Sequence, residues 1–156
     1  MKNRKGFTII ELVLVIGIIA ILSVVSLIGL SGRKNKTELD GATKQITALL
    51  REAQSKSVSQ INGSAWGVHF ENSTATAPFY ALFSGLTYAS TSATSYYRLS
   101  AKILYATSSI ALGAAKDIAF SQISGFATAT SSVVLYVSGA PNISSTIAVG
   151  ISGAVN

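Results

Sequence analysis

A long apolar run near the N-terminus constrains the fold more than any other feature of this sequence. Residues 7–30, FTIIELVLVIGIIAILSVVSLIGL, carry a single charged side chain, Glu11. A helix rises about 1.5 Å per residue, so the run would span roughly 36 Å, enough to cross a hydrocarbon core of about 30 Å. A carboxylate inside such a helix is costly unless it is paired. We therefore predict a membrane-length helix in which Glu11 needs a specific partner.

The charges around the apolar run leave three interpretations of the N-terminus. Lys2, Arg4 and Lys5 precede the run, and a second basic cluster follows it at residues 33–36. A cleaved secretory signal would have a shorter apolar region and a small-x-small cleavage site, and this run has neither. A plain membrane anchor explains the length but leaves Glu11 unexplained. The balanced flanking charge also gives that anchor no clear orientation.

The third interpretation accounts for the basic leader, the apolar run and the single acid together. The string KGFTIIE, which begins at Lys5 and is followed by the apolar run, resembles the class III signal of type IV pilins and type II secretion pseudopilins. The resemblance implies that prepilin peptidase cuts between Gly6 and Phe7 and that Phe7 becomes N-methylated. It also implies that Glu11 is needed for assembly. Because an unpaired carboxylate amid aliphatic side chains is costly, we hypothesise that Glu11 sets the assembly register. Many family members carry a proline near the position of Ile28, where this chain has none.

The same resemblance implies a location and a set of partners. It predicts a single-pass precursor in the bacterial inner (cytoplasmic) membrane, followed by a periplasmic or cell-surface filament. The implied partners are prepilin peptidase, the inner-membrane assembly platform, the membrane before assembly, and other pilin or pseudopilin subunits. The resemblance implies no cofactor.

The segment from residue 31 to residue 61 has the spacing of an amphipathic helix. Within this segment Thr37 is followed three residues later by Asp40, a pattern that resembles a capping box at the start of a second helical segment. The preceding stretch Gly29–Lys36 is poor helix material, since each glycine costs up to about 1 kcal/mol relative to alanine. We expect the least stable part of the helix there. The predicted buried stripe consists of Leu39, Ala42, Ile46, Leu49, Leu50, Ala53, Val58 and Ile61.

Beyond Asn62-Gly63, which can form a left-handed helix cap, the apolar period changes to that of strands. We predict an α+β fold, in which a long N-terminal α-helix packs on a small antiparallel β-sheet head. The expected parts are a leader at 1–6, a transmembrane or filament-core helix at 7–30, an amphipathic helix at 31–61 and a β head at 62–156. The expected strands are Trp66–Phe70, Phe79–Phe83, Tyr96–Leu104, Ile110–Leu112, Asp117–Phe120, Val133–Val137 and Thr146–Ile151.

The head carries a second resemblance. Leu49–Ser55 followed by Trp66–Phe70 resembles the start of the minor pseudopilin H domain, and Ile118–Phe120 and Ile147–Val155 are similar to its last strands. The chain has no cysteine, so the C-terminal disulfide loop of major pilins cannot form. The preferred interpretation is a minor pseudopilin acting in filament assembly and protein secretion. A major structural pilin and a DNA-uptake minor pilin are the alternatives.

The sequence offers little for catalysis or metal binding. His69 is the only histidine, and it is expected to be a surface residue of a strand. The chain has six acidic residues and no cysteine, so no catalytic, cofactor-binding or metal-binding residue is predicted. The acids beyond residue 61 are Glu71 and Asp117 alone, which disfavours a calcium cage of carboxylates.

Nucleic acid is a partner that the sequence leaves open but does not favour. The nine basic and six acidic residues after residue 6 leave a formal charge of +3, which is too small to indicate nucleic acid by itself. Tyr96, Tyr97 and Arg98 could stack on or grip a DNA strand. The commoner explanation for such residues is packing of alternate side chains in a sheet, with one aromatic residue at its edge.

Overall fold

The computed structural model describes residues 7–156, with the backbone alone described for residues 24–32. The chain forms two compact units, Met1–Asn35 and Lys36–Asn156, and we call the second the head unit. The helix α1 (Ile9–Val58) contributes to both units. It has no interruption at Thr37, so the expected start of a separate helix there is wrong.

The predicted membrane-spanning segment is described only in part. In the part of the chain that the structure describes, no helix is long and apolar enough to cross a membrane. The segment 7–30 includes residues 24–30, whose side chains lie outside that description.

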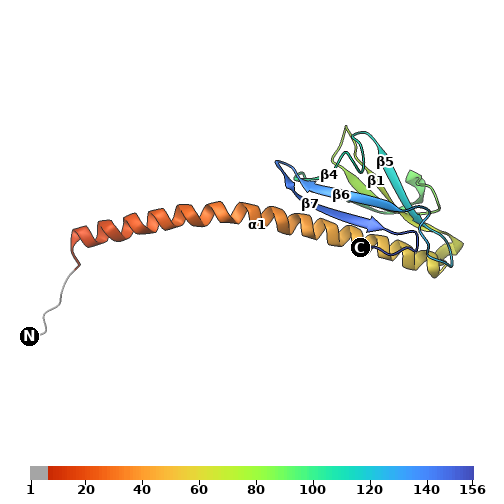
Figure 1. The fold of residues 1–156 in the computed structure, drawn as a ribbon, viewed down its shortest axis with the longest axis horizontal. Coiled ribbons are helices and arrows are strands. Elements are labelled where there is room, and N and C mark those ends of the chain that lie inside the picture. Colours follow the sequence, from red (N-terminus) through yellow and green to blue (C-terminus); the bar gives the residue numbers. More distant parts are fainter. Residues whose placement is uncertain (1–6) are drawn as a thin grey trace, which may run out of the picture. The chain divides into compact units, whose positions relative to one another are not determined.

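The strands of the head unit form two antiparallel sheets, and the short 3-10 helices η1 (Ile61–Gly63) and η2 (Ser90–Ser92) lie in the connections. Figure 1 shows both sheets on one side of the part of α1 that belongs to the head unit. The first sheet is 4-stranded in the order β3-β2-β1-β5 and comprises β1 (Trp66–Glu71), β2 (Phe79–Ser84), β3 (Ala93–Arg98) and β5 (Ala115–Phe120). The second is 3-stranded in the order β4-β6-β7 and comprises β4 (Ile103–Tyr105), β6 (Ser131–Val137) and β7 (Ala140–Val149).

The α+β class and the helix-then-sheet order are confirmed, with two sheets in place of one. The expected strand Tyr96–Leu104 is in fact two strands in different sheets, because the chain turns where the Ile103 N–H donates to the Ser100 carbonyl at 2.9 Å. Ile110–Leu112 is not a strand. Ile110 is nevertheless buried, and its carbonyl accepts a hydrogen bond from the Asn72 side chain at 3.0 Å. A short apolar run in the sequence does not distinguish a strand from a buried loop anchor.

The core lies between α1 and the inner faces of the two sheets. Five members of the predicted helix stripe are buried there, and they pack with Trp66, Val68 and Phe70 of β1 as expected. Val58 and Ile61 are 47% and 42% exposed, so their expected burial is wrong. The helix ends at Val58, and the chain then turns through left-handed conformations at Gln60, Asn62 and Gly63. The five buried stripe residues are Leu39, Ile46, Leu49, Leu50 and Ala53.

The last turn of α1 is fastened to β1 by hydrogen bonds. The fully buried Ser57 hydroxyl accepts a bond from the Trp66 backbone N–H at 2.8 Å. The Trp66 indole N–H donates to the Ile61 carbonyl at 3.0 Å, and the Lys56 ammonium lies 4.6 Å from the Trp66 ring centroid. These contacts fix where the helix ends relative to the first sheet of the head unit.

The lower stability expected at Gly29–Lys36 remains a prediction, because α1 is helical across it. Hydrogen exchange should be faster there than at Leu39–Ala53, where the helix buries its stripe in the core. The two glycines add to the difference by lowering the local helix propensity. Equal protection of the two stretches against hydrogen exchange would contradict this prediction.

Candidate functional site

The start of α1 brings together the residues that the N-terminal motif singles out. Thr8 immediately precedes the helix, and its hydroxyl accepts a hydrogen bond from the Glu11 backbone N–H at 3.3 Å. The Leu12 N–H donates to the Thr8 carbonyl at 3.2 Å. Thr8 is therefore the N-cap, and Thr8-x-x-Glu11 has the sequence of a capping box. The local sequence contains this signal, although a capping box was expected only at Thr37.

The carboxylate of Glu11 lies where the helix itself favours negative charge. Glu11 is in the first turn, whose unpaired backbone N–H groups carry partial positive charge. An exposed acid in this position gains about 0.3–1 kcal/mol. Glu11 is exposed in the isolated chain, so it carries little desolvation cost there. That cost arises only when an apolar surface covers this part of the helix.

The first turns of α1 expose apolar side chains in every direction. Phe7 is 81% exposed and Ile9 is 83% exposed, and the exposure continues along the helix to Leu22, which is 61% exposed. An isolated soluble helix would normally show one polar face. The N-terminal unit is therefore suited to burial against another apolar surface.

The structure does not place every residue of the predicted site. Gly6 and the rest of the leader lie outside the described residues, whereas Phe7, Thr8 and Glu11 are described at the helix start. Cleavage at Gly6, methylation of Phe7 and the register role of Glu11 remain predictions.

Comparison with known protein families agrees with this geometry. Residues 1–27 match the sequence profile of the prokaryotic N-terminal methylation motif. The chain carries a class III signal peptide. This is the signal of type IV pilins and pseudopilins, so the methylation motif supports a pilin-like or pseudopilin subunit. The motif points to a structural subunit rather than an enzyme.

The methylation motif also supports the general expectations about processing and location. It implies cleavage by prepilin peptidase, assembly with other pilin subunits, and a membrane-anchored precursor that later enters a filament. No curated protein and no solved structure matches the chain significantly. The resemblance of the head to the minor pseudopilin H domain is therefore not confirmed.

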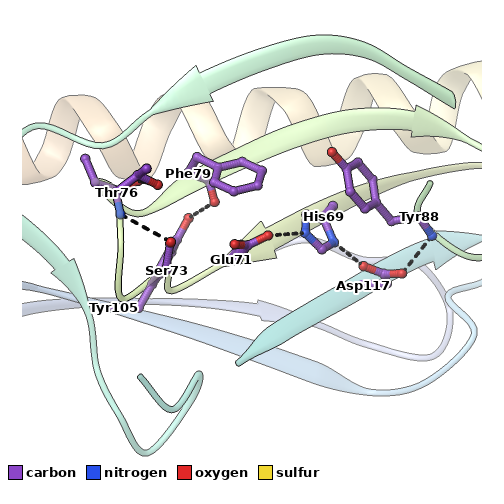
Figure 2. A network of polar contacts seen from close by, with 9 residues as sticks. His69, Glu71, Ser73, Thr76, Phe79, Tyr88, Tyr105 and Asp117 are labelled. Atoms are coloured by element: carbon purple, nitrogen blue, oxygen red, sulfur yellow. Dashed lines mark hydrogen bonds and ion pairs between the residues drawn. The ribbon is translucent and has the colours of Figure 1, made fainter. Parts of the chain in front are cut away.

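A second polar cluster lies in the head unit, around a histidine that we expected at the surface. His69 is only 5% exposed, so that expectation is wrong. Figure 2 shows His69 between Glu71 and Asp117, with Tyr88 beside it. The His69 and Tyr88 rings stack with centroids 3.7 Å apart. The segment between β2 and β3 folds back over the outer face of the first sheet and covers His69. The alternation of side chains within β1 alone does not reveal this cover.

The bonds of this cluster hold the covering segment in place. The Asp117 Oδ1 lies 2.6 Å from His69 Nδ1, which must donate because a carboxylate only accepts. The other oxygen of Asp117 accepts from the Tyr88 backbone N–H at 2.9 Å. Within the described part of the chain, His69 Nε2 has no hydrogen-bond partner, and Glu71 Oε2 lies 3.5 Å away. That nitrogen pairs with Glu71 only when the imidazole is protonated.

The electrostatics of the cluster also act on Tyr88. Burial raises the pKa of Tyr88 above its ordinary value of 10.0, and the nearby Glu71, Tyr96 and Asp117 raise it further. Tyr88 is therefore a neutral phenol at physiological pH. Among the described residues, no group of three or more histidine, aspartate and glutamate side chains is placed to hold a metal ion. We interpret His69, Asp117 and Tyr88 as a clasp that fastens the covering segment to the first sheet.

Asp117→Ala should loosen this clasp. Alanine removes both carboxylate oxygens, so neither the His69 Nδ1–H nor the Tyr88 backbone N–H keeps its acceptor. A hydrogen bond to a charged group contributes about 1.5–3 kcal/mol, so amide exchange at Tyr88 should accelerate on the order of tenfold or more. Glu71→Ala shortens the neighbouring acid in the same way without touching the Tyr88 amide, and it serves as the control. Unchanged exchange at Tyr88 in the Asp117 variant would disprove the clasp.

The aromatic and basic residues that could grip DNA do not all face the same way. Tyr96 is 47% exposed, stacks on Phe79 and has the Arg98 guanidinium 5.4 Å from its ring. Tyr97 instead stacks on the buried Tyr80 with ring centroids 5.4 Å apart and packs against the core. The outer surface of β3 therefore offers one tyrosine and one arginine.

Proposed function

We propose that this chain is a minor pseudopilin, a subunit of a type II secretion pseudopilus or of a related pilus-like filament. The observation that carries the proposal is the methylation motif at residues 1–27. The exposed apolar side chains around the first turns of α1 support it, because a helix bundle in a filament would bury them. The likeness of Leu49–Ser55 and Trp66–Phe70 to the minor pseudopilin H domain favours a minor pseudopilin over a major pilin.

The proposed mechanism is assembly rather than catalysis. Apolar helix surface that leaves the membrane would otherwise meet water, and burying it against neighbouring helices is worth about 25 cal/mol for each Å² kept from water. This burial is non-directional, so it brings helices together without fixing their relative heights. Glu11 supplies the missing register, because its carboxylate becomes costly once it is covered by apolar side chains without a cationic partner. The amino group released at Phe7 by cleavage is that partner.

The proposal predicts a defined mature N-terminus. Mass measurement of the full chain, extracted from membranes of cells that contain a prepilin peptidase, should give a form that begins at Phe7 with one added methyl group. Gly6→Leu should keep the leader, because it replaces the glycine after which the resemblance places the cut. A mature wild-type chain that retains residues 1–6, or that begins after Leu30, would contradict the proposed function.

The DNA-uptake alternative rests on Tyr96 and Arg98 at the outer surface of β3. It predicts that binding of single-stranded DNA weakens steeply as salt rises, because each neutralised phosphate releases counterions. Beyond residue 61 the chain has only Arg98, Lys102 and Lys116, and the Lys116 ammonium donates to the Ser132 carbonyl at 3.1 Å. We therefore expect no measurable DNA binding at physiological salt.

A further inference from the structure

Exposed apolar side chains gather at the end of the head unit where α1 stops. The three segments that carry them are tied together by backbone hydrogen bonds. The Ile123 N–H donates to the Ser57 carbonyl at 3.2 Å, and the Ala127 N–H donates to the Ile151 carbonyl at 3.0 Å. A Cβ added to Gly125 would lie 2.6 Å from the Val58 side chain, so these segments are also in close contact. The end patch, as we call this surface, consists of Val58, Ile61, Ile123, Phe126 and Ile151.

One residue of this end patch, Ile123, occupies a backbone position that suits it poorly. Ile123 has a φ of 66°, in the left-handed region that β-branched residues rarely adopt. It is also 70% exposed, so its side chain gains little from burial in the isolated chain. Glycine would relieve the strain at this position. Folding of the head unit therefore does not account for an isoleucine here, and strained residues of this kind concentrate at functional surfaces.

The surroundings of the end patch define the chemistry of its partner. The segments 57–64, 121–127 and 150–155 contain no lysine, arginine, aspartate or glutamate. Two basic side chains of α1 lie near these segments. Lys56 is paired with Glu52 at 2.9 Å and lies over Trp66, and the Arg51 guanidinium donates to the Val155 carbonyl at 3.1 Å. The three segments themselves offer an acidic or basic partner no charged side chain. The fitting partner is an apolar, uncharged protein surface.

The size of the end patch indicates one contact among several. Five roughly half-exposed apolar side chains present on the order of 500 Å² of surface. A stable two-protein interface buries about 800 Å² on each partner, so the patch alone is too small for a free dimer. In a filament each subunit has several neighbours, and the other contacts raise the effective concentration at this one.

The position of the end patch at the C-terminal end of α1 decides which neighbour it meets. In a filament whose subunits all point in the same direction, with α1 of the head unit along the filament axis, this end of the head unit faces the next subunit along that axis. The end patch therefore contacts a different surface of that neighbour, and not the neighbour's own end patch. Such a head-to-tail contact can repeat along the filament without closing into a ring.

We propose that the end patch docks the next subunit along the filament through an apolar, uncharged surface of that subunit's head. This proposal rests on the proposed function as a filament subunit.

The chain has no cysteine, so single cysteines can report on the end patch in the full-length protein. Ile123→Cys should react readily with a maleimide in the unassembled membrane form. In sheared filaments it should react roughly tenfold more slowly, because a docked contact that opens about a tenth of the time exposes the thiol only during those openings. Leu112→Cys is the control, because Leu112 is 66% exposed elsewhere in the head unit and should stay reactive in both forms. Equal reactivity of the two cysteines in filaments would overturn the docking proposal and leave the proposed function intact. Absence of the wild-type chain from filaments would overturn both.

Two further measurements identify the partner and separate docking from folding. A photo-crosslinking side chain at Phe126 should join, in filaments, to a protein that itself carries the N-terminal methylation motif. Crosslinks to lipid or to a protein without that motif would overturn the proposal. Ile123→Gly should keep or raise the melting temperature of the head unit while lowering incorporation into filaments several-fold, and Leu112→Ser should leave incorporation unchanged. Normal incorporation of Ile123→Gly would also overturn it.

Discussion

Glu11→Ala should leave the chain inserted, cleaved and folded but should reduce its incorporation into filaments by at least tenfold. Insertion survives because the substitution makes the apolar run more apolar. The head unit survives because its core is formed by residues from Leu39 onward. The assembled state is affected because only there can the carboxylate pair with the amino group of a neighbouring subunit. Immunoblots of sheared filaments against total membranes would measure the ratio.

The expected size of this effect follows from the cost of an unpaired charge. A carboxylate buried without a partner costs several kcal/mol, and each 1.4 kcal/mol is a factor of about ten in an equilibrium constant. After cleavage, the Phe7 amino group lies four residues before Glu11 and just outside the start of α1 at Ile9, so the carboxylate can pair with it in the same chain or in a neighbour at the right height. Only the pairing between chains depends on register. Removing the carboxylate therefore leaves the Phe7 ammonium without its partner in every register, and covering that unpaired charge costs several kcal/mol.

Thr8→Val separates the register role of Glu11 from helix capping. It removes the hydroxyl that accepts the Glu11 N–H but keeps the carboxylate and the side-chain shape. Losing an N-cap costs about 1 kcal/mol, so incorporation should fall only modestly. Normal assembly rate and helical symmetry in Glu11→Ala would show that the register role is wrong. An equal loss in Thr8→Val and Glu11→Ala would assign the effect to capping instead.

Gly67→Ala should be among the most damaging single substitutions in the head unit. Gly67 lies in β1 between β2 and β5, and a Cβ there would lie 2.8 Å from the Ile118 carbonyl oxygen and 2.9 Å from the Ala119 Cα. Both contacts are with backbone, so no side-chain rotation can relieve them. Overpacking of this kind costs about 1–3 kcal/mol, which should lower the melting temperature of the head unit by roughly 5–15 °C.

Gly41→Ala provides the matched control with the opposite sign. Gly41 lies within α1 and has nothing within 4 Å of an added Cβ. Alanine there should stabilise the protein by about 0.5–1 kcal/mol, because glycine loses more conformational entropy in a helix. Trp66 is the only tryptophan and is buried in the head unit, so its fluorescence reports unfolding of that unit in both variants. A melting temperature for Gly67→Ala at or above that of the wild type would contradict the tight packing of the first sheet.

The features that indicate the functional class of this protein lie close together in the sequence. The basic leader, Gly6, the apolar run and Glu11 are contiguous, and their meaning depends on order and spacing along one segment. The same holds for the buried stripe of α1, since a helix repeats every 3.6 residues and five of its eight predicted members are in the core. Local periodicity also placed most of the strands, including β1, β2 and β6.

Contacts between segments that are distant in sequence could be found only from the tertiary structure. His69 and Asp117 are paired through the register of β1 with β5, and Tyr88 reaches them from a loop, so no local pattern predicts that His69 is buried. The division of the strands into two sheets has the same cause, because alternation fixes the face of a strand but not its neighbour. The end of α1 is the clearest case. The helical period extends the apolar stripe through Val58 and Ile61, yet the chain leaves the helix there and the core does not cover them. The sequence by itself determined that the chain carries a pilin-type signal and a helix followed by a sheet, because those features depend on spacing along the chain. Only the tertiary structure decided which apolar residues remain at the surface, because burial depends on which distant segments arrive to cover them.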